Sequence, residues 1–595
     1  MRLSPKDGFA ALSLVAMVFL VYWQTGGYGL VNLDDYEYLV RSKAITGGFS
    51  AGGVAWAWRT VEHSIWMPLT WMSYMFDFTV FGPDCWGAMH LHSTAIHAIN
   101  AILVYLVLRL VLPENEHGVA LLAFAGAAFW AWHPLRVESV AWLSSRKDVL
   151  SFMFESVAVV CWIMTGRRKE LDGRFALLYM LSIGAFGIGA LAKPSVMTFP
   201  ILVGALDVFI FRRLRPKCYI LPGIMMLVIA IEASVAQTAG GATKDLSSVP
   251  LWARLLNAMS AYGVYLTNTV WPADLAPQCM SRYPGLPRAL GCGVILSAAA
   301  AGYLGWRGWK IWQKRENPLK EGLSPDYFAA GLIWFSLGIA PFLGIANFGY
   351  HAFCDRFTYI PAVGLSLMLF AWIGNRRRLG GGLLTLVVAL MMSYLSYGQC
   401  GIWESDRKVW SKTLAVDGDR NAIAHQGLGL ASFEFEHDLE AACREFKRVR
   451  ELREDIYFLC AQQHIYALCE LGKTEEAEDV LLWYKRAMVK YRQANQRVDQ
   501  TIYGSFELPV RLSNFEHSQI AVALCDPKQR NWAREEIEKR VEQTDMTPSL
   551  AYLMYRYGVV TENNRLKDIA LEELRRAEKF DSVQYRFLTP KVKQQ

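Results

Sequence analysis

The 595-residue chain has little charge. Asp, Glu, Lys and Arg make up only 19% of it, whereas 53% of its residues are hydrophobic. This composition excludes an ordinary soluble protein of this length and indicates an integral membrane protein. The net charge of +7 lies largely in a few short loops, which is typical of membrane topology rather than of nucleic-acid binding. No nucleic-acid partner is therefore expected.

Metal and disulfide motifs are also missing. The eleven Cys include no C-x-x-C pair, so we interpret them as small hydrophobic side chains rather than as metal ligands or a disulfide framework. No H-x-x-x-H or H-E-x-x-H occurs on the polar segments discussed below. A metal site made by His90, His92 and His97 is an alternative to the preferred interpretation, which is that these are hydrogen-bonded, helix-capping histidines. We predict no metal and no other cofactor, and a divalent metal remains the alternative.

Long apolar stretches recur up to about Gly398. A helix needs about 20 apolar residues to cross a bilayer, and a backbone in lipid must satisfy its own hydrogen bonds, so these stretches should be spanning helices. The first lacks an A-x-A cleavage pattern and is expected to stay uncleaved. The eleven predicted spans are 8–24, 91–112, 118–133, 149–166, 175–192, 196–211, 219–238, 288–305, 327–346, 357–374 and 379–397.

Clusters of Lys and Arg predict the orientation of the spans, because such clusters favour the cytoplasmic side. They fall on one side only if a further apolar stretch, 251–271, is a re-entrant or interfacial helix; twelve or thirteen simple crossings are the alternative. The N-terminus is then cytoplasmic, and the tail is periplasmic or luminal, in a bacterial inner membrane or the endoplasmic reticulum. The clusters lie before the first span and near 167–174, 212–217, 306–320 and 376–378.

Several cations on the predicted outer face break this tendency and need a reason. Together they suit an anionic ligand such as a phosphate at the level of the lipid headgroups, because Arg binds phosphate in a bidentate manner. For any one cation, contact with a lipid headgroup or a local salt bridge, such as Arg146 with Asp148, is the alternative. The candidate substrate-binding residues are Arg136, Glu138, Arg146, Lys147, Asp148, Lys193, His351 and Arg356.

Two adjacent carboxylates, Asp34 and Asp35, stand in "VNLDDYEYL" soon after the first span. A carboxylate near a reacting hydroxyl can act as a general base. Neighbouring residues of an extended segment point to opposite sides, so one Asp can face a cavity while the other caps a helix or binds backbone. The alternative is that the pair only forms an N-cap before a short helix, and the spacing favours neither.

Five stretches follow one another in the order found in TMTC-like (transmembrane and tetratricopeptide repeat) proteins of the GT-C glycosyltransferase superfamily. The chain resembles this family over about residues 20 to 400. The stretches are "WMPLTWMSYMFDFTVFGPDCWGAMHLHSTAIHAINAILVYLVLRL", "AWHPLRVESVAWLSSRKDVLSFMF", "LAKPSVMTFPILVGALDVF", "YLTNTVWPADLAPQCMSRYPGLP" and "GYHAFCDRFTYIPAVGL".

The resemblance implies transfer of a sugar, with inversion, from a polyprenyl-phosphate carrier to an acceptor hydroxyl on the non-cytoplasmic face. In eukaryotic members the sugar is mannose and the acceptor is protein Ser or Thr. The essential acid of the first outer loop matches Asp34 or Asp35. Ser93 departs from the family, which tends to have Asn there. The family's Arg-Lys-Asp and DR-x-x-Y-x-P motifs match Arg146, Lys147 and Asp148, and Asp355, Arg356, Tyr359 and Pro361.

The tail after residue 398 is polar and helical, with two similar helix pairs at 428–446 and 465–481. Their offset of 35 is close to the tetratricopeptide period of about 34, although His437 stands where the second pair has Gly472. Such repeats form an α-solenoid whose concave face can hold an extended peptide, and a scaffold without a ligand is the alternative. The predicted domains are a GT-C-like membrane domain, 1–398, and a repeat domain, 399–595.

The predicted fold is therefore all-α: a polytopic, GT-C-like membrane bundle followed by a tetratricopeptide-type solenoid. The expected partners are a polyprenyl-phosphate-linked sugar, a protein or peptide acceptor and membrane lipids. The alternatives are a transporter or flippase, an assembly factor with a docking tail, and a GT-C enzyme acting on lipid A, a polysaccharide or a lipid-linked glycan. Transporters place ionisable residues near the bilayer midplane, often in repeated halves, whereas these charges gather at one interface.

Overall fold

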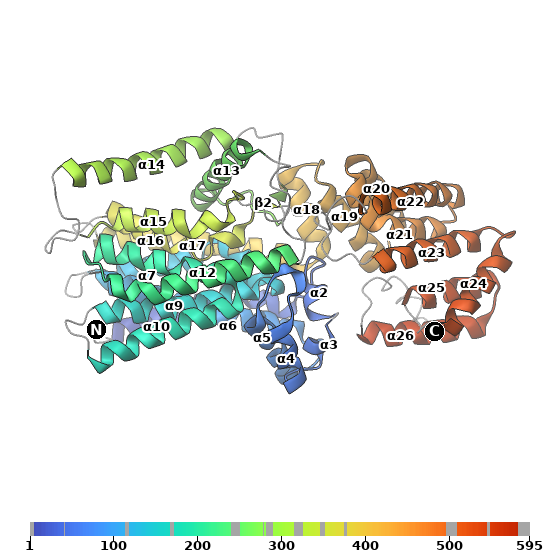
Figure 1. The fold of residues 1–595 in the computed structure, drawn as a ribbon, viewed down its shortest axis with the longest axis horizontal. Coiled ribbons are helices and arrows are strands. Elements are labelled where there is room, and N and C mark those ends of the chain that lie inside the picture. Colours follow the sequence, from blue (N-terminus) through green and yellow to red (C-terminus); the bar gives the residue numbers. More distant parts are fainter. Residues whose placement is uncertain are drawn as a thin grey trace. The chain divides into compact units, whose positions relative to one another are not determined.

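The chain forms two units in the computed structural model (Figure 1). The N-terminal unit comprises residues 1–30 and 44–404, and the C-terminal unit comprises residues 31–43 and 405–595. The predicted boundary at residue 398 falls inside the last long apolar helix. The structure describes residues 5–40, 42–112, 118–166, 172–239, 250–277, 279–280, 289–313, 325–345, 351–373, 378–495, 508–543 and 548–580.

The N-terminal unit is a bundle of apolar helices. Among the described residues, six stretches are long and apolar enough to cross a membrane, and they contain α1 (Pro5–Tyr22), α6 (Trp86–Val111), α9 (Arg146–Gly166), α10 (Gly173–Ala192), α12 (Pro216–Ala239) and α17 (Arg378–Cys400). The shorter apolar helices are α7 (Val119–Ala131), α11 (Phe199–Ala205) with η6 (Leu206–Ile210), α15 (Tyr327–Ile339) with η8 (Ala340–Phe342), and α16 (Val363–Ile373). With α14 (Ala289–Gln313), they coincide with the eleven predicted stretches. The chain is a membrane protein.

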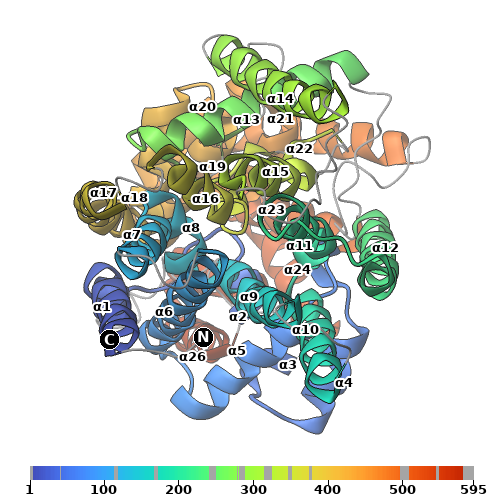
Figure 2. The same ribbon diagram turned by 90° about the vertical axis from the view of Figure 1, so that its left-hand side faces the viewer.

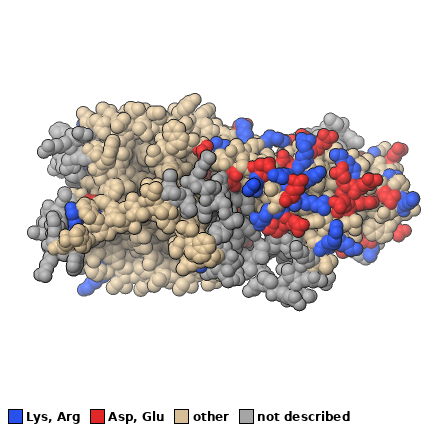
Figure 3. Space-filling view, turned by 90° about the horizontal axis from the view of Figure 1, so that it is seen from above, with Lys and Arg blue, Asp and Glu red and all other residues tan. Residues whose placement is uncertain are grey.

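These helices run side by side (Figure 1) and most are seen nearly end-on in Figure 2. α10 packs on α9, α9 on α6, α6 on α7 and α7 on α17. α15 and α16 approach most closely where Gly331 and Gly364 face one another, because a Cβ on either glycine would meet the carbonyl oxygen of the other. On the face seen in Figure 3 the bundle is almost free of charged side chains, as a lipid-facing surface requires.

Helix α13 (Leu251–Val270) differs from its neighbours in direction (Figures 1 and 2). It has 20 residues but is not among the six helices that are long and apolar enough to span. Its residues Tyr262 and Tyr265 share a buried apolar cluster with Phe335 and Ile339 of α15. That this stretch does not cross the membrane remains a prediction.

The connections at one end of the bundle consist of short helices. The stretch between α1 and α6 contains η1 (Trp23–Gly27), α2 (Asp35–Leu39), α3 (Lys43–Thr46), α4 (Ala51–Arg59), η2 (Glu62–Ser64) and α5 (Pro68–Phe81). The other short elements are η3 (Pro134–Arg136), α8 (Val137–Ala141), η4 (Leu143–Ser145), η5 (Pro194–Thr198), η9 (Asp355–Thr358) and η11 (Gly401–Glu404). Within the described residues, the only strands are β1 (Cys279–Met280) and β2 (His351–Phe353), which pair antiparallel, with Cys279 opposite Phe353. The predicted all-α fold is confirmed.

The C-terminal unit is built from successive helix pairs, in which α19 packs on α20, α21 on α22, α23 on α24 and α25 on α26. His437 and Gly472 both adopt a left-handed backbone, with φ of 57° and 71°, so the predicted equivalence of these two turns is confirmed. The helices are α18 (Asp406–Asp417), α19 (Ala422–Ala431) with η12 (Ser432–Glu436), α20 (Leu439–Leu452), α21 (Glu454–Glu470), α22 (Thr474–Asn495), α23 (Leu508–Cys525), α24 (Arg530–Gln543), α25 (Pro548–Val560) and α26 (Asn564–Phe580).

Candidate functional site

The polar connection between α7 and α9 is buried. Every residue from His133 to Asp148 lies inside the N-terminal unit, although the stretch carries several ionisable side chains. Buried polar groups are costly unless they are hydrogen-bonded or paired with an opposite charge. The partners of these side chains therefore show how the connection is held.

Glu138 of α8 is paired with Arg356 of η9. The backbone N–H of Arg356 donates to one oxygen of Glu138 at 3.0 Å, and the guanidinium donates to the other oxygen. The guanidinium carbon also lies 5.2 Å from the ring centre of Trp142 and 4.9 Å from that of Phe357. One carboxylate thus joins two connections that are more than two hundred residues apart in the sequence.

Lys193, which follows α10, is paired with Asp148 of α9. Its ammonium donates to Oδ1 of Asp148 at 2.5 Å and lies 5.7 Å and 5.8 Å from the ring centres of Phe342 and Phe357. Oδ2 of Asp148 is buried and has no hydrogen-bond partner in the described part of the chain. One acceptor oxygen of this pair is therefore still available.

Lys147 completes this group of side chains. Its ammonium donates to the carbonyl oxygen of Ser144 at 2.8 Å and lies 5.7 Å from the ring of Trp142, which also contacts Arg356. The structure thus brings together side chains from three separate connections. We call Arg136, Glu138, Lys147, Asp148, Lys193, Asp355 and Arg356 the polar cluster.

Arg136 ties η3 to η9. Its two terminal nitrogens donate to the carbonyl oxygen of Thr358 at 2.8 Å and to the hydroxyl of Thr358 at 2.6 Å. Burial lowers the pKa of Arg136 to about 10, so it remains a cation at neutral pH. Its guanidinium lies 5.5 Å from the ring of Tyr359, whose hydroxyl contacts His97 and Asn100 at 2.6 Å and 3.1 Å. These contacts fix the position of η9 against α6.

Asp355 is a buried carboxyl to which the sequence analysis gave no role beyond its place in a motif. Only 5% of its surface is exposed. Burial, followed by the negative charge of Glu138, raises the pKa of Asp355 well above its usual range, against the opposing effect of Arg136 and Arg356. This shift favours the protonated form of Asp355, which can donate a hydrogen bond.

The polar cluster carries an excess of positive charge. Four of its members are cations, and three carry a carboxyl group. Glu138 pairs with Arg356, and Asp148 pairs with Lys193. Because Arg and Lys bind phosphate oxygens, a group of four buried cations is suited to an anionic ligand.

Arg146 lies in a separate contact, because all three of its nitrogens are already bound. Nε donates to the Ser93 hydroxyl at 3.1 Å, Nη2 donates to the Met89 carbonyl oxygen at 2.6 Å, and Nη1 donates to Asp77. The other oxygen of Asp77 lies 2.5 Å from Nδ1 of His92. Arg146 and Asp77 are both fully buried, so this pair holds α5, α6 and α9 together.

The observed ion pairs differ in two respects from what the sequence predicted. The alternative salt bridge between Arg146 and Asp148 is wrong, because Arg146 pairs with Asp77 and Asp148 with Lys193. Asp77 itself was missed by the sequence analysis. The available signal was a lone acid within the apolar "MSYMFDFTVF" of α5, since a buried charge needs a partner.

The other two histidines of α6 are hydrogen-bonded. Nε2 of His90 lies 3.0 Å from the carbonyl oxygen of Gly29. The nitrogens of His97 lie 2.6 Å from the Tyr359 hydroxyl and 3.0 Å from the Ala131 carbonyl oxygen. The prediction that these three histidines are hydrogen-bonded is therefore confirmed, whereas the prediction that they cap a helix is wrong, because all three lie inside α6.

Asp34 and Asp35 belong to the C-terminal unit and differ from one another. Asp35 is fully buried and accepts a hydrogen bond from the backbone N–H of Val31 at 3.1 Å. Asp34 occupies the N-cap position of α2, is partly exposed, and makes no capping hydrogen bond with its side chain. The backbone N–H of Asn32 donates to Asp406 at 2.5 Å, which anchors the segment on α18. The side chain of His351, at the start of β2, lies outside the described residues.

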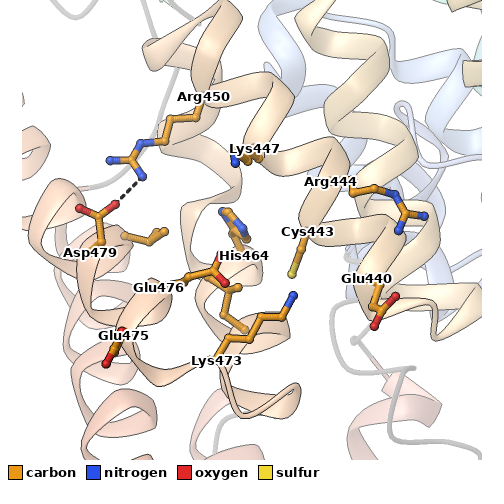
Figure 4. Close-up of a pocket in the computed structure, with 12 residues that line it drawn as sticks. Glu440, Cys443, Arg444, Lys447, Arg450, His464, Lys473, Glu475, Glu476 and Asp479 are labelled. Atoms are coloured by element: carbon orange, nitrogen blue, oxygen red, sulfur yellow. Dashed lines mark hydrogen bonds and ion pairs between the residues drawn. The ribbon is translucent and has the colours of Figure 1, made fainter.

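A cavity of about 630 Å³ lies in the C-terminal unit between α20, α21 and α22. Figure 4 shows charged side chains of both signs around it, with His464 and Cys443 between them and an ion pair between Arg450 and Asp479 at 2.8 Å. The charged lining residues are Glu440, Arg444, Lys447, Arg450, Lys473, Glu475, Glu476 and Asp479. This mixed lining suits a polar ligand such as a peptide segment.

His464 is expected to make the C-terminal unit less stable as the pH falls. Burial, followed by the charges of Arg450 and Lys447, lowers the pKa of His464 to about 3. An unfolded histidine binds a proton near pH 6.5, so the free energy of unfolding should fall by about 1.4 kcal/mol per pH unit below that value. His464→Gln can still accept from Tyr457, which lies 2.6 Å from Nδ1, and its slope in urea unfolding at several pH values should be smaller than that of the wild type by this amount.

His425 supplies a matched control, because its effect on stability should change with pH in the opposite direction. Burial lowers its pKa, but its contacts with Glu445 at 2.6 Å and Asp419 at 3.1 Å outweigh burial and raise it. The stabilisation that protonated His425 provides is complete below about pH 6.5 and is lost as the pH rises through the raised pKa. His425→Gln should therefore lower the free energy of unfolding most in acid. If the free energy of unfolding of His464→Gln falls with pH as steeply as that of the wild type, the His464 ring is not held neutral in the folded protein.

These features define an all-helical membrane protein with a buried, positively charged polar cluster and a tail of helix pairs. Its sequence is similar to those of proteins named protein O-mannosyl-transferase. It is 30% identical to Tmtc1 of Drosophila melanogaster over 216 residues, which are 35% of this chain and 23% of that protein. It is 26% identical to Tmtc2 of Drosophila melanogaster over 274 residues, 42% of this chain and 28% of that protein.

A relative of the same name in Caenorhabditis elegans is 21% identical over 448 residues, which are 70% of this chain and 59% of that protein. The chain is thus TMTC-like in sequence. It spans less than two thirds of the length of each of these relatives. No family model matches the chain, and no solved structure matches it.

Proposed function

We propose that this protein is a membrane glycosyltransferase that transfers a hexose, most simply mannose, from a polyprenyl-phosphate carrier to a hydroxyl group of a protein. The observation that carries the proposal is the group of four buried cations in the polar cluster, together with the similarity to proteins named protein O-mannosyl-transferase. We further propose that the reaction inverts the sugar and occurs on the non-cytoplasmic face.

The donor phosphate becomes more negative during this reaction, and the cations of the polar cluster favour that change. A sugar phosphodiester carries a single negative charge, whereas the phosphate monoester left behind carries about −1.5 to −2 at neutral pH. Groups placed to stabilise charge that develops in the transition state increase the rate, whereas equal binding of substrate and transition state does not. Cations placed beside the donor phosphate therefore suit the departing phosphate better than they suit the intact donor.

The cations of the cluster differ in the role that we propose for them. Both terminal nitrogens of Arg136 are held by Thr358, and all three nitrogens of Arg146 are bound, so we assign these two residues to positioning. Lys147, Lys193 and Arg356 are assigned to the donor phosphate. In its protonated form, which burial favours, Asp355 can donate a hydrogen bond to a phosphate oxygen.

In this proposal Asp34 takes the proton of the acceptor hydroxyl, and Asp35 holds the segment that carries Asp34. The C-terminal helix pairs bind the acceptor protein, and the charged cavity of Figure 4 is the proposed place for a polar part of it. The relatives' names support a protein acceptor, as does the tail of helix pairs.

Replacing Lys193 by Met is expected to lower kcat/KM for the polyprenyl-phosphate sugar at least about tenfold, because one cation no longer stabilises the departing phosphate. The measurement is transfer of labelled mannose to total periplasmic or luminal protein by the full chain in lipid nanodiscs. Wild type that moves the donor across the bilayer without forming glycoprotein would instead support a flippase.

Charge-matched variants separate electrostatics from packing. Asp148→Asn removes the carboxylate that pairs with Lys193, and the double variant Asp148→Asn/Lys193→Met restores the wild-type net charge. The double variant should therefore recover part of the activity lost in Lys193→Met. Lys310→Met, which removes a cation 4.1 Å from the ring of Trp306 on α14, should leave activity unchanged. Equal rates in all four variants would remove the phosphate-binding role of the cluster.

A further inference from the structure

The cavity of the C-terminal unit lies between two walls of opposite charge (Figure 4). Helix α20 contributes three cations and one acid to the lining, whereas the stretch that begins α22 contributes three acids and one cation. The first wall is therefore net positive and the second net negative. The α20 wall consists of Glu440, Arg444, Lys447 and Arg450, and the α22 wall consists of Lys473, Glu475, Glu476 and Asp479.

The two walls are joined by a single ion pair. Arg450 donates to Asp479 at 2.8 Å, and its guanidinium carbon lies 5.8 Å and 5.7 Å from the ring centres of Tyr457 and Trp483. The remaining charged residues of the walls form no ion pair within the described part of the chain. Their charges of opposite sign instead face the cavity of about 630 Å³. A ligand that carries both signs can therefore pair with both walls.

The floor of the cavity carries no charge. It includes His464 and Leu468 of α21, which are both buried, and Nδ1 of His464 lies 2.6 Å from the Tyr457 hydroxyl. Burial, followed by the charges of Arg450 and Lys447, lowers the pKa of His464 to about 3, so its ring is uncharged at neutral pH. Lys447 and Glu476, by contrast, are exposed. The cavity thus suits a ligand with an uncharged backbone and charged groups on its two sides.

An extended peptide has this form. Its main chain is uncharged, and its successive side chains point to opposite sides. In a peptide that lies between the two walls, every second side chain would therefore face α20 and the others would face α22. Opposite charges attract, so acidic side chains are favoured on the α20 side and basic side chains on the α22 side. A ligand with a single charge could pair with only one of the walls.

We propose that the cavity binds an extended peptide segment in which acidic and basic side chains alternate, with the acids against the α20 wall and the bases against the α22 wall. This inference rests on the proposed function, because it names the feature by which the helix pairs would recognise an acceptor protein. The charge pattern of a segment, rather than the residue that carries the acceptor hydroxyl, then selects the acceptor.

The test measures binding of labelled synthetic peptides to the full chain in lipid nanodiscs by fluorescence anisotropy. One peptide alternates Glu and Lys, a second has the same composition with all Glu in one block and all Lys in another, and a third alternates Gln and Lys. The alternating Glu–Lys peptide should bind at least about fivefold more tightly than the block peptide, the size of one favourable exposed ion pair, and its affinity should fall as salt is added. Equal affinity for these two peptides would overturn the proposal.

A variant of the α20 wall tests which charges meet. Lys447→Met should weaken binding of the alternating Glu–Lys peptide about fivefold and leave binding of the Gln–Lys peptide unchanged, because that peptide offers no acid to Lys447. Lys485→Met is the matched control, since Lys485 is an exposed cation of α22 that does not line the cavity. Both replacements are at the surface, so the fold should be retained. Equal weakening of both peptides by Lys447→Met would contradict the proposed pairing.

Binding and sugar transfer can fail separately. If the peptides bind with the expected charge pattern but the wild type transfers no mannose to protein, the proposed activity is wrong and the peptide site stands. If mannose is transferred to protein but the affinity for peptides does not depend on the order of their charges, the proposed activity stands and the peptide site is wrong.

Discussion

Replacing Asp34 by Asn is expected to lower kcat for sugar transfer by about 100-fold or more while leaving the fold intact. Removal of a general base typically costs about 10²- to 10⁴-fold in rate. Asn has nearly the same shape but cannot accept the proton of the acceptor hydroxyl. Asp34 is partly exposed and makes no capping hydrogen bond, so its replacement removes no structural contact of that kind. The measurement is the mannose-transfer assay at saturating donor and acceptor, paired with thermal unfolding.

Replacing Asp35 is expected to lower the stability of the protein rather than kcat. It is fully buried and binds the backbone N–H of Val31, so Asp35→Ala leaves a buried donor unsatisfied at a cost of about 1–3 kcal/mol. Its main effect should be a lower unfolding midpoint of the C-terminal unit, with any loss of activity following the loss of folded protein. The two neighbours thus separate a chemical role from a structural one.

Glu37→Gln is the matched control, because it neutralises a third carboxylate of the same short helix. It should keep most of the wild-type activity. Wild-type kcat in Asp34→Asn would show that this residue is not the base. A loss in Asp34→Asn that is matched by an equal loss in Glu37→Gln would point to the charge of the segment rather than to proton transfer.

The sequence was sufficient for features that depend on local pattern. Apolar stretches of spanning length, such as those of α6 and α10, predict helices because only internal hydrogen bonding satisfies a backbone in lipid. The turn at His437 could be predicted because a repeated pattern places it where the next helix pair has Gly472. The candidate cations could be selected because they break the positive-inside tendency, and Glu138, Lys147, Asp148, Lys193 and Arg356 do gather in one cluster.

Pairing between distant residues could not be predicted. Nothing local distinguishes Arg146, which is bound to Asp77 from 69 positions earlier, from its neighbour Lys147, which belongs to the polar cluster. Both are basic residues at the start of α9, and successive helical residues point in different directions, so the fold alone decides their roles. The raised pKa of Asp355 likewise results from burial beside Glu138, a residue more than two hundred positions away.

Replacing Asp77 by Asn is expected to destabilise the N-terminal unit by about 3–5 kcal/mol, because Arg146 would remain fully buried without its counter-charge. The measurement is thermal or denaturant unfolding of the full chain in detergent. Asp84→Asn is the matched control, since Asp84 lies exposed in the turn between α5 and α6, where a surface change usually matters by less than about 0.5 kcal/mol. Equal midpoints for the two variants would show that the Asp77–Arg146 pair does not support the fold.

The double variant Asp77→Leu/Arg146→Met distinguishes a structural pair from a catalytic one. Replacing both members of a buried ion pair by apolar side chains of similar volume is often neutral for stability, so this variant should unfold close to wild type. If Arg146 acts only by holding α9 against α5 and α6, transfer activity should return with stability. Restored stability without restored activity would instead assign Arg146 to the donor phosphate, because Lys147, Asp148 and the rest of the polar cluster are unchanged in this variant.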